Sequence, residues 1–293
     1  MMWIALALLA ACGSATTSLM LKRAVREGGA VVSTVVARGI AGLLLAIAFT
    51  VVGTWPVLTS AYWSTLAFVV PFEVGGMLCL TLALRTGEVS AVQPIMGLLP
   101  LLVMAGGVVF LHEVPSTLAA VGIVLVAIGL YCVGLRKGAS WLEPVRALGD
   151  SRASWFAVLS ALFWTVTSLM HKIGIAQVGA LPWAATLTFS SAVALGCTLP
   201  FIARTTGSVG VPVHVWSWVR LVTLAGLSVT VQQMGFFGAM RRTQTGYVIA
   251  VSSMSILIAT ALGVLLLREQ GGAHRITGAL LVSGGAGLIA IFG

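Results

Sequence analysis

Apolar residues occur along this chain in long runs that short polar segments separate. Helices need about 17 or more such residues to cross a bilayer. Ten runs qualify, at 2–21, 31–53, 61–84, 88–111, 116–135, 154–174, 183–203, 217–240, 246–267 and 276–292. No basic residue precedes the first run, so we expect it to be retained and not removed as a secretory signal. The pattern predicts an all-α membrane protein with ten transmembrane helices.

The sequence also repeats itself. Residues 17–22 and 167–172 share five of six residues, including Thr, Ser, Met and Lys. At an offset of 156, Gly107, Glu113, Gly122 and Gly129 correspond to Gly263, Glu269, Gly278 and Gly285. An odd number of helices per half forces the halves into opposite orientations. We therefore expect two inverted five-helix repeats, 1–135 and 153–293, with a linker at 136–152.

Composition excludes a soluble fold, because 59% of the residues are hydrophobic and only 8% are charged. The net charge of +9 would indicate nucleic acid in a soluble protein, but in a membrane protein it reports topology, and we expect no nucleic-acid partner. The connections after odd-numbered spans hold eleven basic residues, against three on the other side. The positive-inside rule then places those connections in the cytoplasm and both termini outside.

Neither a metal site nor a cofactor is predicted. The four cysteines lie within apolar runs without Cys-x-x-Cys spacing. His112 and Glu113 begin a zinc-like motif, but Ser116 occupies the position where the second histidine is needed. An intramembrane enzyme would need a nucleophile with a base, paired acids or a metal cluster, whereas only one acid lies in mid-span. We therefore expect no enzyme and no catalytic residue.

Glu73 is that single mid-span acid, near the centre of the third span. A carboxylate at this depth is costly and normally faces a bundle interior or an aqueous cavity, where it binds a proton or a cationic group. Its equivalent in the second half is Val229, so the acid does not belong to what the repeat preserves. The alternative is a structural acid bonded to a neighbouring helix. We interpret Glu73 as a substrate-binding or proton-coupling residue.

Other polar residues lie in spans that the repeat would bring around the centre. Gln93 lies in the fourth span, Gln232 and Gln233 in the eighth, and Ser253 in the ninth. Such residues also join helices by ordinary hydrogen bonds. Trp164, midway along the sixth span, would stack on a cationic or aromatic substrate or fill the core. The prediction is a substrate cavity lined by spans 3, 4, 6, 8 and 9.

Four residues are predicted to have structural or gating roles. Arg38, early in the second span, would by default extend its head group to the membrane interface. Pro100 interrupts the fourth span. The equivalent residue of the ninth span is Ile256, so the sequence does not decide whether that helix is broken. Glu113 and Glu269 end the fourth and ninth spans, where capping and contacts between helices explain them.

The segment from Ser90 to Pro100, followed by Glu113, Gly122 and Gly129, resembles the EamA-type modules of the drug/metabolite transporter superfamily. The later spans repeat the pattern. Arg38, Lys22 and Lys172 also match residues that are common at these positions in such modules. It implies a ten-helix exporter of small polar metabolites, often amino acids, with cytoplasmic termini. The charge count places the termini outside, and we retain that orientation.

Together these patterns predict a secondary transporter that exports small polar metabolites, with amino acids as the expected substrates, across the inner (plasma) membrane. A flippase for a lipid-linked or amphipathic substrate is the nearest alternative. The expected partners are a small-molecule substrate and membrane lipid, in a monomer or a dimer. Proton coupling through Glu73 is a further expectation that the sequence leaves open.

Overall fold

The computed structural model describes residues 1–86, 89–135, 151–201, 214–259 and 273–293. These residues form helices and no strands. Eight helices in the described ranges are long and apolar enough to cross a membrane. Two shorter apolar helices, Thr245–Ala259 and Thr277–Phe292, lie in the described parts of the ninth and tenth predicted spans. The described part of the chain is therefore a helical membrane protein.

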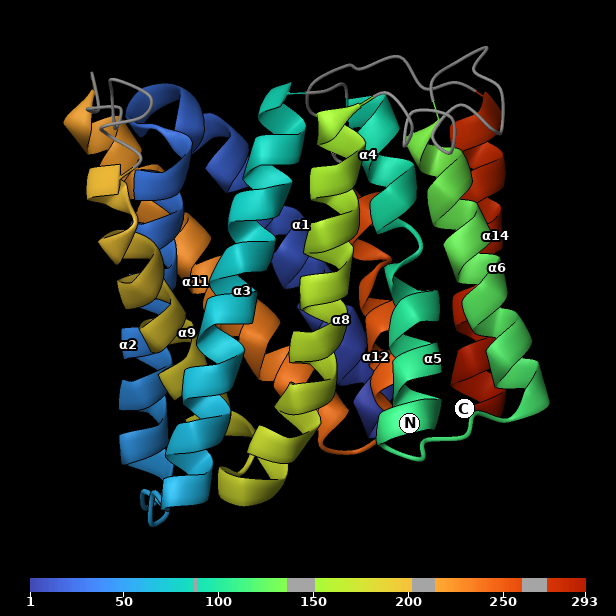
Figure 1. The fold of residues 1–293 in the computed structure, drawn as a ribbon, viewed down its shortest axis with the longest axis horizontal. Coiled ribbons are helices and arrows are strands. Elements are labelled where there is room, and N and C mark those ends of the chain that lie inside the picture. Colours follow the sequence, from blue (N-terminus) through green and yellow to red (C-terminus); the bar gives the residue numbers. More distant parts are fainter. Residues whose placement is uncertain (87–88, 136–150, 202–213, 260–272) are drawn as a thin grey trace.

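Figure 1 shows the helices standing side by side with both termini at one end of the bundle. The first half contains α1 (Met2–Gly28), α2 (Ala30–Val52), α3 (Ser60–Thr86), α4 (Val89–Met96), α5 (Leu99–Phe110) and α6 (Thr117–Gly134). The second half contains α8 (Arg152–Val178), α9 (Ala180–Cys197), α11 (Val215–Met240), α12 (Thr245–Ser252) and α14 (Ala273–Phe292).

A single glycine joins the first two helices of each half. Gly29 has φ 79° and ψ 152°, and Gly179 has φ 89° and ψ 167°. Residues with a side chain rarely adopt such a positive φ, so glycine permits the abrupt reversal of the chain. The two turns are 150 residues apart, the offset of the first repeated motif. Arg38 of α2 and Thr188 of α9 consequently occupy equivalent positions, nine residues after each turn.

The fourth and ninth predicted spans are broken at equivalent points. A turn at Gly97 and Leu98 separates α4 from α5, and a turn at Ser253 and Met254 ends α12. The two turns have equivalent backbone hydrogen bonds. The Gly97 N–H donates to the Gln93 carbonyl, and the Ser253 N–H donates to the Ile249 carbonyl. Only the first break is followed by a proline, Pro100. In the second, the Ser253 hydroxyl donates to the Ile249 carbonyl at 2.7 Å, so that carbonyl has a second partner at the break.

The most extensive helix pairs each take one helix from each half. The first helix of each half packs along the third helix of the other, as α1 on α11 and α8 on α3. The second helices, α2 and α9, pack on each other, as do the last helices, α6 and α14. Buried residues from both halves share one large apolar cluster. The interior of the bundle therefore lies between the halves.

The repeated glycines make the α6–α14 contact possible. A Cβ on Gly122 would lie 2.7 Å from the Gly285 carbonyl oxygen, and one on Gly285 would lie 2.5 Å from the Gly122 oxygen. Gly129 and Gly278 face each other in the same way, each with a Cβ position 2.7 Å from the other's oxygen. Small residues allow such approach where lipid removes the hydrophobic drive for association.

This contact predicts opposite results for two adjacent glycines of α14. Gly285→Ala should lower the stability of the purified protein in detergent by about 1–3 kcal/mol, because its Cβ meets backbone that cannot move aside. Gly284→Ala should leave the melting temperature unchanged or slightly higher, since nothing lies within 4 Å of its Cβ position. Thermal unfolding of both variants is the measurement, and equal losses would contradict the packing described.

Candidate functional site

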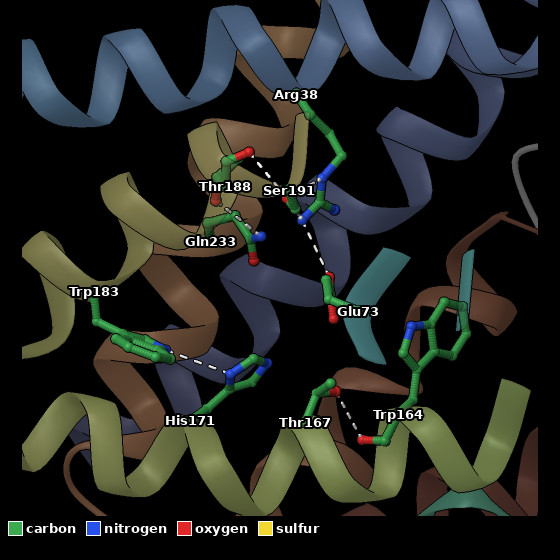
Figure 2. A network of polar contacts seen from close by, with 9 residues as sticks. All are labelled: Arg38, Glu73, Trp164, Thr167, His171, Trp183, Thr188, Ser191 and Gln233. Atoms are coloured by element: carbon green, nitrogen blue, oxygen red, sulfur yellow. Dashed lines mark hydrogen bonds and ion pairs between the residues drawn. The ribbon is translucent and has the colours of Figure 1, made fainter. Parts of the chain in front are cut away.

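An ion pair between α2 and α3 lies in the interior of the bundle. Nη2 of Arg38, on α2, lies 3.1 Å from Oε1 of Glu73, on α3. Only 13% and 12% of the two side chains are exposed. Figure 2 shows the Arg38 head group turned toward Glu73 and away from its own helix. The sequence analysis expected by default that the Arg38 head group would extend to the membrane interface. It instead points inward, because its counter-charge lies inside the bundle.

Ser191 of α9 fixes the guanidinium of Arg38. Its Oγ accepts hydrogen bonds from Nε at 3.2 Å and Nη2 at 2.9 Å, and donates to the Thr188 carbonyl at 3.0 Å. The Thr188 hydroxyl in turn accepts a hydrogen bond from the Gln233 amide of α11, at 3.3 Å. This polar network, formed by Arg38, Glu73, Thr188, Ser191 and Gln233, joins α2, α3, α9 and α11 through hydrogen bonds between their side chains and one bond to a backbone carbonyl.

Helix α8 lies on the opposite side of the network (Figure 2). His171 accepts a hydrogen bond from Nε1 of Trp183 at 3.4 Å, which makes its Nδ1 the unprotonated nitrogen. Trp164 packs against α3 at Gly76, where a Cβ would lie 2.7 Å from the indole nitrogen. The Gly76 carbonyl also accepts the Ser160 hydroxyl at 2.9 Å. Gly76 therefore holds Trp164 one helical turn from Glu73.

A second ion pair lies toward the end of the bundle that holds the termini. Nζ of Lys172 is 3.1 Å from Oε1 of Glu113 and donates to the carbonyls of Met240, at 2.9 Å, and Thr243. The other oxygen of Glu113 accepts the Thr245 N–H at 2.7 Å, at the first residue of α12. A carboxylate is favourable at a helix N-terminus. Glu113 thus ties α8 and α12 to the end of α5.

The remaining predicted residues lie outside this network. Among the described residues, neither Gln93 nor Gln232 makes a hydrogen bond to the network. Ser253 bonds its own helix at the α12 break, and Pro100 begins α5 beyond the equivalent break. Glu269 falls outside the described residues. The network therefore includes residues of α2 and α9, which correspond to the second and seventh predicted spans. Neither span belonged to the predicted lining of the cavity.

Three residues of these sites were not singled out from the sequence, namely Thr188, Ser191 and, as an ion-pair partner, Lys172. Serine and threonine are common in transmembrane helices, and nothing local distinguishes these two. A signal did exist for the ion pair, because Arg38 and Glu73 are opposite charges inside consecutive apolar runs. Two such charges are expected to neutralise each other in a membrane.

The fold and its buried charges define an integral multi-pass membrane protein. The EamA-like transporter family matches the chain at residues 1–135 and again at 151–291. The chain belongs to this family, and it has the general transport role that the family name describes.

A relative and a solved structure are also similar to this chain. A protein of Sinorhizobium sp described as "Uncharacterized transporter in cobO 3'region" is 28% identical over 143 residues, which are 47% of this chain and 98% of that protein. A solved structure described as "Crystal structure of protein" has a TM-score of 0.78 and 16% identity, and the match covers 99% of both chains. The last shows the fold alone. The family and the relative indicate a transporter, a class that is generally not an enzyme.

The ion pair predicts strong coupling between Arg38 and Glu73 in stability. Glu73→Gln alone should destabilise the protein by about 3–5 kcal/mol, because it leaves a buried guanidinium without its counter-charge. The double variant Arg38→Gln/Glu73→Gln should be more stable than Glu73→Gln, since no buried charge remains. Thermal unfolding in detergent measures both, with Glu27→Gln near the end of α1 as the control. Additive losses in the double variant would contradict a direct pair.

Proposed function

We propose that this protein is a secondary transporter that exports small polar metabolites, and specifically amino acids, across the inner (plasma) membrane. The observation that carries the proposal is the buried carboxylate of Glu73, held 3.1 Å from Arg38 inside a transporter fold. Ionisable groups in such an interior normally belong to a substrate or ion pathway. Every amino acid has an ammonium group that a carboxylate can bind as a charge-assisted hydrogen bond acceptor.

We also propose the ten-helix, two-repeat organisation, with repeats at 1–135 and 153–293 and a linker at 136–152. The double family match supports it, as does a relative that is covered almost completely by half of this chain. The exchanged pairing of α1 with α11 and of α3 with α8 is what a two-fold axis between the halves would produce. The substrate site would then lie where the halves meet, which is where the polar network lies.

Trp164 and Gln233 complete the proposed site. The indole of Trp164 lies beside Gly76 on the helix that holds Glu73, within reach of a cationic group bound there. Gln233 is joined to the Arg38 side of the network through Thr188. Gln93, Gln232 and Ser253 would contact a substrate only in another conformation of the protein, since they lie outside the network in this one.

A flippase for an amphipathic substrate is the second candidate, and one observation favours it. A mostly apolar groove runs between α1 and α11, lined by residues that include Cys12, Met20, Leu224 and Leu227. The last two have exposed fractions of 49% and 47%. An acyl chain would fit such a surface. The polar network favours the amino-acid transporter, because a chain in the groove makes no use of a buried charge pair.

Transport by the purified protein in proteoliposomes tests the proposal. Labelled amino acids should move faster than through empty liposomes, and Glu73→Gln should slow them on the order of tenfold or more, the effect of one lost charged hydrogen bond. Glu27→Gln, the same substitution near the end of α1, should transport as the wild type does. Comparable rates in Glu73→Gln at matched reconstitution would show that Glu73 is only a structural acid.

Two added arms separate the alternatives. A pH gradient should drive accumulation by the wild type but not by Glu73→Gln if this carboxylate carries protons, and should have no effect if it only recognises substrate. Transfer of fluorescent phospholipids between leaflets, without amino-acid movement, would favour the flippase.

The orientation proposed from the basic residues predicts where labels react. In a cysteine-free background, Val57→Cys, in the exposed loop between α2 and α3, should react with an impermeant thiol reagent added to intact cells. Arg26→Cys, near the other end of α1, should react only after permeabilisation. The connection between α2 and α3 lies at the end of the bundle that holds the termini (Figure 1). The reverse labelling pattern would place the termini in the cytoplasm.

A further inference from the structure

The polar network is electrically neutral without any ligand. Arg38 and Glu73 bring one positive and one negative charge, and Thr188, Ser191 and Gln233 are uncharged. A ligand with a single charge can bind one member of the pair only by separating it from the other. The abandoned charge would then be buried without a partner, which is strongly unfavourable in a low-dielectric interior. An ammonium-only or carboxylate-only compound would therefore leave one of the two buried charges unpaired.

A ligand with both charges removes this obstacle. Its carboxylate can accept hydrogen bonds from the Arg38 guanidinium, whose planar fork suits two carboxylate oxygens. Its ammonium group can donate to the Glu73 carboxylate. Both buried charges remain paired, and the number of charged hydrogen bonds increases. An α-amino acid carries the two groups on one carbon atom, so a modest widening of the pair accommodates it.

The anchoring of the two side chains is unequal, which determines how the pair can open. Arg38 is held by two hydrogen bonds to Ser191 of α9 in addition to its bond to Glu73. For Glu73, the described residues show only the bond to Arg38. Glu73 is on α3, whose principal partner is α8, whereas Arg38 is on α2, which packs on α9. Insertion of a ligand would thus shift Glu73 and α3 relative to a fixed Arg38.

Neither charge belongs to what the two halves share. The equivalent of Arg38 is Thr188, and the equivalent of Glu73 is Val229. The glycine turns, the helix breaks and the close α6–α14 contact, in contrast, occur in both halves. The five-helix arrangement of the second half is therefore built without such a pair, which marks the pair as a feature of the first half alone.

From this geometry we propose that Arg38 is a second recognition residue and that the protein selects zwitterions. The ligand replaces the Arg38–Glu73 ion pair with one bond from its carboxylate to Arg38 and one from its ammonium group to Glu73. This inference rests on the proposed function and adds the basis of its selectivity. Because binding leaves the total charge of the network unchanged, it needs no proton uptake by Glu73.

Competition assays with the wild type in proteoliposomes test the selectivity. L-Leucine should compete with labelled amino acid, whereas its decarboxylated analogue, isoamylamine, and its deaminated analogue, 4-methylpentanoate, should each compete on the order of tenfold to a hundredfold more weakly. Where L-leucine is not transported, the best amino acid of the panel and its two matching analogues take its place. These ligand-side comparisons do not depend on the folding of any variant.

Variants test the role of Arg38. Arg38→Gln should weaken amino-acid binding by a similar factor and should reduce the preference for the zwitterion over isoamylamine, because Glu73 is then free for an amine. Arg220→Gln, at an exposed arginine of α11, is the matched control and should bind as the wild type does. Where Arg38→Gln does not fold, Arg38→Lys keeps the charge without the fork and should bind more weakly with the preference intact.

The outcomes separate the two proposals. No transport of any metabolite would overturn the proposed function itself. Transport of amino acids with equal competition by isoamylamine or 4-methylpentanoate would overturn zwitterion selection and leave the transporter standing. Transport confined to singly charged or neutral metabolites would overturn the inference in the same way. Unchanged preference in a folded Arg38→Gln variant would remove Arg38 from recognition.

Discussion

A charge in the interior of a membrane bundle needs an opposite charge beside it, and the centre of this structure is arranged around that constraint. Arg38 and Glu73 supply each other's counter-charge at 3.1 Å, and the Ser191 hydroxyl accepts two hydrogen bonds from the guanidinium. Four helices must be placed correctly for this network to form, because α2, α3, α9 and α11 each contribute to it. The pair therefore links the arrangement of the helices to the chemistry that the interior can perform.

Close helix packing makes that arrangement possible. Glycines that face backbone, such as Gly122 and Gly285, bring helices of opposite halves into contact. Positive-φ glycines reverse the chain between α1 and α2 and between α8 and α9. The second ion pair, Lys172 with Glu113, joins the halves near one end of the bundle. The halves thus share a framework of glycine contacts, while charge is placed unequally between them.

Much of the fold was predictable from the sequence, because the bilayer imposes a simple length and polarity on each span. The first eight apolar runs coincide with described helical segments long enough to cross a membrane, and the glycines of the repeated motif meet at α6 and α14. The sequence did not decide whether the ninth span is broken, because no proline lies there. The backbone nevertheless turns after α12 with the same hydrogen bonds as after α4. The turn therefore depends on its surroundings in the fold, which a search for proline does not detect.

The site was less predictable, because its bonds join residues far apart in the chain. Glu73 was singled out by its depth alone. Its partner Arg38 was predicted to have a structural or gating role, with its head group at the interface by default, and Ser191 lies 153 residues from Arg38. Gln233 joins the network whereas its neighbour Gln232 does not, since adjacent residues of a helix point in different directions. Sequence identifies which polar residues enter the membrane, and packing decides which of them meet.

An experimental structure with a bound amino acid tests the central claim most directly. The distance between Arg38 Nη2 and Glu73 Oε1 should increase beyond ion-pair range, with the ligand's carboxylate on Arg38 and its ammonium group on Glu73. The hydrogen bonds from Arg38 to Ser191 should remain. A ligand bound elsewhere, with the Arg38–Glu73 pair still closed, would contradict it.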